Sequence, residues 1–357
     1  MTVETIIRQA LEKGASDVHL VPSSRVFFRI NGQLQSEGTA ILKSDDIENF
    51  ILSSLNETEK KEFKKRKQID FVLPAFGVRL RGNAFYQERG VSLSIRIINQ
   101  KIREFSSLGF PSFLLKKIIE LKQGLVLLVG PTGCGKSTTM ASVIQELVRD
   151  KPKHIISIEN PIEYLFNVEH SIIQQRELNR DVGSFYEGIK AAVREDPNVL
   201  IVGEMRDLRT MEAAITMAET GHLVISTLHT NDAPQTISRI IDSFSGVEQK
   251  QIRNQLAQNL KTVVSQRLLP SLASQERQMC CEILTSNYAI QKHIRNNEVH
   301  LIKNAMQMDN SGDNILFEKC LALNVNQGKL AKNIALENAL DPDLFLELLS
   351  ANSKNHK

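Results

Sequence analysis

The pattern of apolar and polar residues predicts two parts of the chain with different architectures. In the first part, apolar residues recur every three or four positions between residues 3 and 11, which predicts an amphipathic helix that Gly14 can end. A second helix is expected after the N-cap and acidic residues Ser44-Asp45-Asp46. Four strand-like stretches lie at residues 26–30, 33–34, 78–86 and 91–98, the first two joined by the turn-forming pair Asn31-Gly32. We therefore expect a small α+β domain over residues 1–98.

After a short polar connector at residues 99–110, the pattern changes to continuous apolar runs separated by helical periodicity. The runs lie at residues 125–129, 155–158, 199–202 and 223–225. Runs of this length and composition are typical of buried parallel strands. Residues 111–357 are therefore predicted to form an α/β domain, in which the last hundred or so residues are mostly helical.

Composition and charge narrow the class of protein. The chain has 44 basic and 41 acidic residues and a net charge of +3. This small net charge does not favour binding to nucleic acid or to a membrane surface. The most basic stretch, from Lys60 to Lys67, is interleaved with glutamates and has no aromatic partners, which favours a solvated helix face over direct nucleic-acid binding. The run at residues 125–129 is too short to span a bilayer, so any membrane association is expected through partners. Four cysteines without C-x-x-C spacing favour a reducing cytoplasm.

The first chemical motif follows the first buried run. Residues 130–137 match G-x-x-x-x-G-K-[ST], between an expected strand and an expected helix. In such a loop the backbone N–H groups surround a phosphate, Lys136 reaches the β- and γ-phosphates, and Ser137 ligates Mg²⁺. Cys134 is expected to be a small filler in the loop. The predicted nucleotide-binding residues are Gly130, Pro131, Thr132, Gly133, Cys134, Gly135, Lys136, Ser137 and Thr138.

Acidic residues and a histidine follow the other buried runs. Glu204 follows the run at 199–202 after Gly203 and is the candidate base that activates water. Glu159 and Glu163 follow the run at 155–158 and are candidate groups around Mg²⁺. His229 follows the fourth run and is a candidate γ-phosphate sensor. His222 and His229 alone lack the third ligand that a zinc site needs.

Two arginines in the N-terminal strands allow two interpretations. Arg81 is expected with Arg79 on the face of its strand opposite Val78 and Leu80, and Arg96 alternates with Ile95 and Ile97 in the next strand. In a monomer they are solvated charges. In an oligomer, an arginine from a neighbouring subunit can neutralise charge in the transition state of hydrolysis.

Taken together, these motifs resemble the type IV pilus retraction ATPases, the PilT/PilU-like branch of the secretion ATPase superfamily. The Walker A motif, Asp box, atypical Walker B motif and His box of that family correspond to Gly130 to Ser137, Ile158 to Glu163, Val199 to Asp207 and Glu219 to His229. Gly14 to Leu20 resembles the opening of the family's PAS-like domain. Arg81 to Phe85, with Ile95-Arg96, matches its arginine-bearing strands.

The resemblance implies a PAS-like N-terminal domain followed by a RecA-like P-loop ATPase domain with C-terminal helices. It implies a ring-shaped homo-hexamer that binds ATP and Mg²⁺ at subunit interfaces, at the cytoplasmic face of the inner membrane. The expected work is pilus retraction for twitching motility or DNA uptake, with a pilus platform protein and a paralogous retraction ATPase as partners. By resemblance, Glu204 is catalytic, Glu163 assists in the Mg²⁺ shell, His229 senses the γ-phosphate, and Arg81 and Arg96 reach across the interface.

Two departures from the family pattern leave more than one function open. Asn160 stands where the Asp box normally has Asp, and Gln291 where a C-terminal stretch normally has Arg. Both primary PilT-like and accessory PilU-like roles therefore remain. The chain could also be a pilus assembly or type II secretion ATPase, a nucleic-acid translocase relying on residues 60–67, or a nucleotide-binding adaptor with weak turnover.

Overall fold

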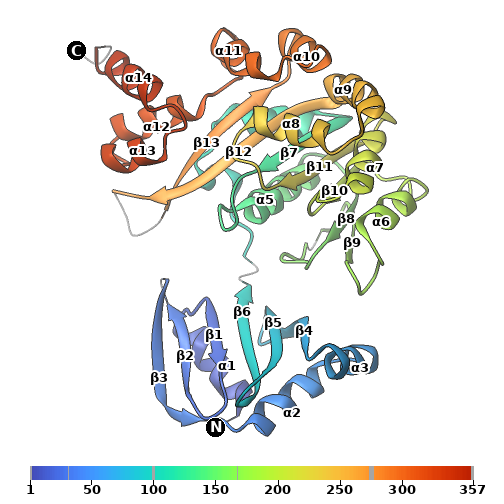
Figure 1. The fold of residues 1–357 in the computed structure, drawn as a ribbon, viewed down its shortest axis with the longest axis vertical. Coiled ribbons are helices and arrows are strands. Elements are labelled where there is room, and N and C mark those ends of the chain that lie inside the picture. Colours follow the sequence, from blue (N-terminus) through green and yellow to red (C-terminus); the bar gives the residue numbers. More distant parts are fainter. Residues whose placement is uncertain (1, 31, 99–100, 167, 273–276, 355–357) are drawn as a thin grey trace. The chain divides into compact units, whose positions relative to one another are not determined.

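The computed structural model describes residues 2–30, 32–98, 101–166, 168–272 and 277–354. The chain divides into two compact units, Met1–Lys101 with Glu163–Leu165, and Ile102–Ile162 with Phe166–Lys357 (Figure 1). Each unit is described by itself. Residues 99 and 100 of the predicted connector lie outside the described residues, as does Asn31 of the predicted turn.

The first unit is an antiparallel sheet with helices packed against it. Its strands, in the spatial order β3-β2-β1-β6-β5-β4, are β1 (Asp17–Leu20), β2 (Arg25–Ile30), β3 (Gln33–Ile41), β4 (Gln68–Ala75), β5 (Val78–Gln87) and β6 (Gly90–Ile98). Its helices are α1 (Val3–Glu12), α2 (Ser44–Ser54) and α3 (Glu57–Arg66). Apolar residues of α1 and α2, including Ile6 and Ile51, form one core with Val18 and Leu93 of the sheet.

The sequence expectation differs from this unit in its strands, since β1 and β4 were not predicted. Strand β3 extends to Ile41, well past the predicted residues 33–34, because pairing with β2 continues along polar residues that give no apolar pattern. Strand β4 pairs with β5 along its full length although its sequence contains Pro74. That proline is tolerated because β4 is the edge strand of the sheet.

The second unit contains a seven-stranded sheet in the order β13-β12-β7-β11-β10-β8-β9. Its strands are β7 (Gly124–Val129), β8 (His154–Glu159), β9 (Ile172–Glu177), β10 (Val199–Val202), β11 (Leu223–Leu228), β12 (Leu260–Pro270) and β13 (Arg277–Thr285). The four strands predicted from apolar runs are β7, β8, β10 and β11, and they lie side by side in parallel. Strand β13 is antiparallel to β12. The prediction of mostly helical structure is wrong for these two strands, whose apolar residues are interrupted by polar ones such as Ser265 and Gln266.

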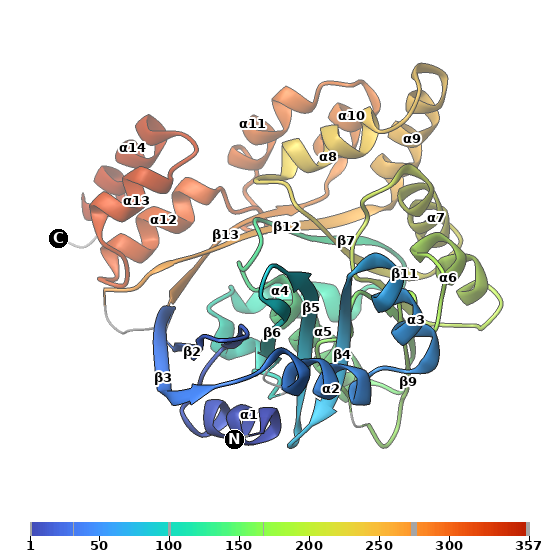
Figure 2. The ribbon, with the colours of Figure 1, turned by 60° about the horizontal axis from the view of Figure 1, so that its bottom comes forward.

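Helices cover both faces of this sheet, and Figure 2 shows the two layers. One face packs against α4 (Ser112–Glu120) and α5 (Lys136–Asp150). The other packs against α6 (Phe185–Ala192), α7 (Leu208–Glu219), α8 (Ala233–Asp242), α9 (Gly246–Asn259), α10 (Tyr288–Arg295) and α11 (Ile302–Gln307). Successive residues of each buried strand point to opposite faces of the sheet and pack in one or the other of these two cores. These strands are therefore apolar along their whole length.

The C-terminal helices form a separate small core. Helices α12 (Phe317–Asn326), α13 (Lys332–Asn338) and α14 (Pro342–Lys354) gather beside β12 and β13 (Figure 1). Phe317 and Phe345 are buried there with Leu269 and Cys280 of those strands. Among the helices that the structure describes, none combines the length and the apolar character needed to cross a bilayer.

Candidate functional site

The predicted phosphate-binding loop lies between β7 and α5, at the carboxyl edge of the parallel strands. Gly130 has a φ of 139° and Gly135 a φ of 90°, a region of backbone conformation that favours glycine. A Cβ atom on Gly130 would collide with the backbone carbonyl of Gln266 on β12. The glycines are therefore needed both for the turn and for the close approach of the loop to β12.

Lys136, the first residue of α5, turns back over this loop. Its Nζ donates hydrogen bonds to the carbonyl oxygens of Gly130 at 2.6 Å and Pro131 at 3.0 Å, and it lies 3.5 Å from Nδ1 of His229. Burial lowers the pKa of Lys136, whereas the nearby Cys134 and Glu204 act to raise it. A partly buried ammonium group thus faces the loop in which P-loop proteins hold phosphates.

Glu204 and His229 lie beside this ammonium group. Oγ1 of Thr227, on β11, donates a hydrogen bond to the Gly203 carbonyl at 2.6 Å. The backbone carbonyl of Thr227 accepts a hydrogen bond from the Met205 N–H at 3.1 Å. Because both neighbours of Glu204 are bound to Thr227, Glu204 is held next to β11. Glu204 Oε2 then lies 3.6 Å from Nε2 of His229 and 2.9 Å from Nε of Arg206. The structure therefore brings together Lys136, His229 and Glu204, three residues separated by up to 93 positions.

The surroundings of the His229 imidazole lower its pKa and so favour its neutral form. Burial is the largest cause that lowers the pKa of His229, and the positive charges of Lys136 and Arg206 lower it further. Glu204 opposes them only in part. A neutral imidazole can donate from one nitrogen and accept at the other, so His229 can respond to a change in charge or position on either side.

The other predicted acids are arranged differently. Glu159 Oε1 accepts hydrogen bonds from Ser157 Oγ at 2.7 Å and Gln175 Nε2 at 3.2 Å. Glu163 follows on the loop after β8, in the segment Glu163–Leu165 that groups with the first unit. Nowhere in the described part of the chain do three or more His, Cys, Asp or Glu side chains form a metal-binding group.

Arg81 and Arg96 lie in the first unit, on adjacent strands. They are direct partners in the antiparallel ladder of β5 and β6 and therefore point to the same face of the sheet. Nε of Arg96 donates to Asp17 Oδ1 at 3.0 Å. Although burial acts to raise the pKa of Asp17, hydrogen bonds from Ser16 and Arg96 lower it below its usual range. Asp17 thus offsets part of the repulsion between the two guanidinium groups.

Several residues around the loop were not predicted from the sequence. Gln266 on β12 donates to the carbonyl of Cys134 at 2.8 Å, and Arg277 on β13 donates to that of Gly133 at 3.2 Å. A cavity of about 500 Å³ adjoins the loop, lined among others by Thr138, Thr139, Leu268, Met279 and Arg103. Thr138 was predicted and Thr139 follows it in α5, but Gln266, Arg277, Leu268, Met279 and Arg103 belong to no short motif, because they come from strands and a connector far from the loop in sequence. Cys134 is buried, and burial raises the pKa of its thiol.

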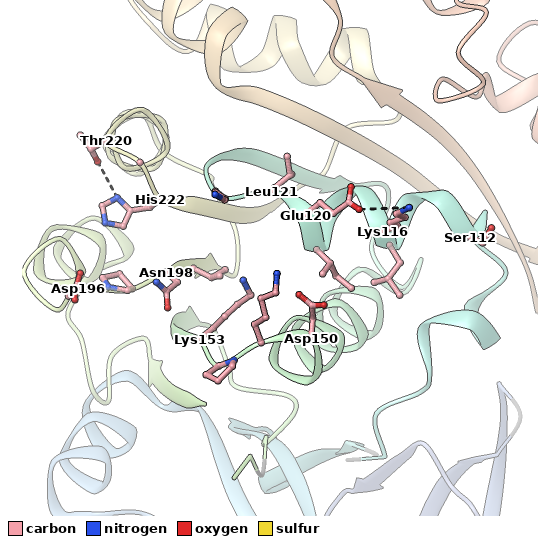
Figure 3. A pocket seen from close by; sticks show the side chains of 18 residues that line it. Ser112, Lys116, Glu120, Leu121, Asp150, Lys153, Asp196, Asn198, Thr220 and His222 are labelled. Carbon is pink, nitrogen blue, oxygen red and sulfur yellow. Dashed lines mark hydrogen bonds and ion pairs between the residues drawn. The ribbon is translucent and has the colours of Figure 1, made fainter. Parts of the chain in front are cut away.

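A larger hollow of about 980 Å³ lies at the opposite, amino edge of the same strands. Figure 3 shows Asp150, Lys153 and His222 around it. Nδ1 of His222 lies 3.2 Å from the Met217 carbonyl oxygen and 3.3 Å from Thr220 Oγ1. His222 precedes β11 and His229 follows it, so the two histidines lie at opposite ends of that strand.

A glycine-rich loop that holds a lysine beside a carboxylate and a histidine, at the carboxyl edge of a parallel sheet, defines a P-loop nucleoside triphosphatase. The family described as type II/IV secretion system protein matches residues 1–340, and the chain belongs to this family. Membership confirms the resemblance found in the sequence and the predicted class of enzyme, an ATPase.

Individual relatives agree with this family. The chain is 35% identical to the type IV pilus retraction ATPase PilT of Pseudomonas aeruginosa over 346 residues, which covers 97% of this chain and 100% of PilT. It is 34% identical to the type IV pilus ATPase PilU of the same organism, covering 100% of this chain and 94% of PilU. A crystal structure of the pilus retraction motor PilT with bound ADP matches with a TM-score of 0.89 and 40% identity, over 96% of this chain and 98% of that one.

Proposed function

We propose that this chain is an ATP-hydrolysing motor that powers the retraction of type IV pili. The observation that carries the proposal is the contact of Lys136 and Glu204 with His229 beside the P-loop. It is supported by similarity to PilT and PilU along nearly the whole chain. The motor works as a homo-hexamer at the cytoplasmic face of the inner membrane, with a pilus platform protein as its partner.

Each site residue has a proposed role. Residues Gly130 to Thr138 bind the phosphates of ATP, and Lys136 exchanges its carbonyl contacts for the β- and γ-phosphates. Ser137 ligates Mg²⁺, and Glu163 and Glu159 act through its water shell. Since the described acids form no metal cage, phosphate oxygens and water complete the coordination, as is usual for Mg²⁺. Glu204 activates the attacking water, and His229 senses the γ-phosphate.

The remaining parts of the nucleotide fit the neighbouring cavity. Its apolar side chains Leu268 and Met279 suit a purine ring, and Arg103 and Arg277 suit the ribose and phosphate groups. The seven-stranded sheet is the RecA-like ATPase domain, residues 111–357. The six-stranded sheet with α1 and α2 on its core face is the PAS-like domain, residues 1–98, and residues 99–110 link the two.

An accessory role beside a paralogous retraction ATPase is the second candidate. Asn160, which replaces the usual Asp, is exposed on the loop after β8 and brings no charge toward a metal. Gln291 is partly exposed on α10, and Tyr288 of the same helix is exposed. A subunit with weaker metal binding is better suited to work beside a stronger motor than alone.

The proposal is tested by ATP hydrolysis in mixed rings. We expect the ATPase rate per subunit to rise with protein concentration, because Arg81 and Arg96 complete the site of a neighbouring subunit. Arg81→Ala should lower the rate without lowering the melting temperature. Rings that combine Arg81→Ala and Glu204→Gln subunits should regain activity above either parent, because some interfaces then carry both intact residues. Mixed rings, confirmed by mass spectrometry, that regain none would contradict the exchange of arginines between subunits.

A further inference from the structure

Glu282 on β13 is a fully buried carboxylate for which the proposed chemistry has no use. Its Oε1 accepts a hydrogen bond from the Ala233 N–H at 2.7 Å, and its Oε2 is buried without a hydrogen-bond partner in the described part of the chain. A buried carboxylate is costly to desolvate. Its one strong contact is with the first residue of α8, where the unpaired N–H groups of a helix favour negative charge.

The position of Glu282 in the sheet connects it with the nucleotide site. Glu282 pairs with Ser265 of β12, Ser265 with Val129 of β7, and Val129 with Leu228 of β11. These residues form one row across four strands. Val129 is followed directly by the P-loop and Leu228 by His229. Because Val263 and Leu284 pack in the core that includes α8, alternation places Ser265 and Glu282 on that same face.

Ser265 and Glu282 together hold the segment between His229 and α8. Ser265 Oγ donates to the Asn231 carbonyl at 2.7 Å, and Glu282 accepts from Ala233 two residues later. Asp232 is the N-cap of α8 and accepts from the Gln235 N–H at 2.7 Å. Two buried side chains from neighbouring strands therefore fix the path of the chain within four residues of His229.

We infer that Glu282 is a positioning residue, which anchors the start of α8 and thereby holds His229 between Lys136 and Glu204. The inference rests on the proposed function, since it assigns a role in ATP hydrolysis. It also means that a displacement of His229 is passed to β13, next to the C-terminal helices. Small errors in the placement of a reacting group can cost large factors in rate, so the anchor contributes to turnover without contacting ATP.

The charge of Glu282 is not what anchors the helix. Burial raises the pKa of Glu282 to about 7, the hydrogen bond from Ala233 acts to lower it, Asp232 and Glu318 act to raise it, and Lys303 of α11 acts to lower it. Oε1 can accept the Ala233 hydrogen bond whether the carboxyl group is protonated or ionised. Glutamine, which keeps an acceptor oxygen at this place, should therefore substitute for it.

A double-mutant cycle between Glu282 and His229 tests the inference. We expect Glu282→Ala to lower kcat of ATP hydrolysis about 10- to 100-fold, while the Kd for a fluorescent ATP analogue changes less than about twofold. Glu282→Gln should keep most of the native kcat. In the His229→Ala background, Glu282→Ala should cause no further loss, because there is no longer an imidazole to position.

The control is Glu318→Ala, which removes another buried carboxylate that accepts one backbone hydrogen bond, from Asp341 at 2.9 Å. It should lower the free energy of unfolding and leave kcat unchanged.

An equal loss of kcat on adding Glu282→Ala to the native and the His229→Ala chains would overturn the inference, as would a native kcat in Glu282→Ala. If Glu282→Ala does not fold, the same cycle with Ser265→Ala decides by the same criterion. Failure of the proposed function shows separately, as hydrolysis that survives Lys136→Ala.

Discussion

The two edges of the seven-stranded sheet offer very different environments to a ligand. At the carboxyl edge, Lys136 and Glu204 are partly buried, and the more exposed His229 lies close to both. At the amino edge, the larger hollow of about 980 Å³ is lined by Lys116, Lys153 and other charged residues of both signs. Lys116 pairs only loosely there, with its Nζ 3.9 Å from Glu120 Oε1 and 78% of its side chain exposed.

This difference shows that the volume of a hollow does not by itself identify a site of chemical reaction. Solvent-exposed charges interact weakly because water screens them, whereas a charge held close to a titratable group shifts its pKa, as the Lys136 ammonium helps to lower the pKa of His229. Strand β11 shows the same difference, because it has a histidine at each end. Among the described residues, only His229, at the carboxyl end, contacts a lysine and a glutamate. Matched substitutions at the two edges therefore test whether only the carboxyl edge takes part in ATP turnover.

The largest expected effect is that of Lys136→Ala. Removing the ammonium group leaves phosphate charge uncompensated, so ATP turnover should fall at least about 100-fold. Its matched control is Lys153→Ala at the amino edge, which should keep native turnover and ATP affinity. Steady-state phosphate release measures both variants. Comparable losses in the two lysine variants would mean that the carboxyl edge is not distinguished from the other.

The paired histidines give the next effect. His229→Ala removes the group between Lys136 and Glu204 and should lower kcat about 10-fold or more, the worth of a hydrogen bond to a charged group. His222→Ala removes contacts with Thr220 and the Met217 carbonyl, so it should lower thermal stability slightly and leave kcat intact. Kinetics and melting curves on both variants separate the roles. A kcat loss confined to His222→Ala would reverse the assignment of the two edges.

The smallest effect concerns Asn160. Restoring a carboxylate on an exposed loop adds a partly screened charge near the proposed Mg²⁺ site, so Asn160→Asp should lower the Mg²⁺ concentration for half-maximal ATPase by about two- to fivefold. Titrating Mg²⁺ at saturating ATP measures the shift. Identical titration curves for the native and Asn160→Asp chains would remove the metal argument for an accessory role.

The sequence predicted the centre of the sheet and the residues at its carboxyl edge. Continuous apolar runs identified β7, β8, β10 and β11, and parallel strands must end at one edge, so the residues after them were expected to meet. Glu204 and His229 do meet there. In the first unit, the strand stretches predicted at residues 78–86 and 91–98 correspond to β5 and β6, where Arg81 and Arg96 are direct ladder partners.

The residues that the sequence did not predict depend on long-range pairing. Strands β12 and β13 mix polar and apolar residues, so the pairing of β12 with β7 and of β13 with β12 cannot be inferred from periodicity. Gln266 reaches Cys134 across 132 positions, and Glu282 reaches Ala233 across 49. Neither residue lies in a motif. Their importance appears only when the strands are assembled, because burial and a specific partner give them their role.

The central claim is that the carboxyl edge both binds ATP and hydrolyses it through Glu204. The most direct test measures ATP binding and hydrolysis by Glu204→Gln in the same preparation. The amide keeps the shape of the side chain but cannot accept a proton, so the Kd for ATP should stay within about twofold while kcat falls on the order of 10²- to 10⁴-fold. Native hydrolysis by Glu204→Gln would contradict the account and move the catalytic role to another acid, Glu163 or Glu159.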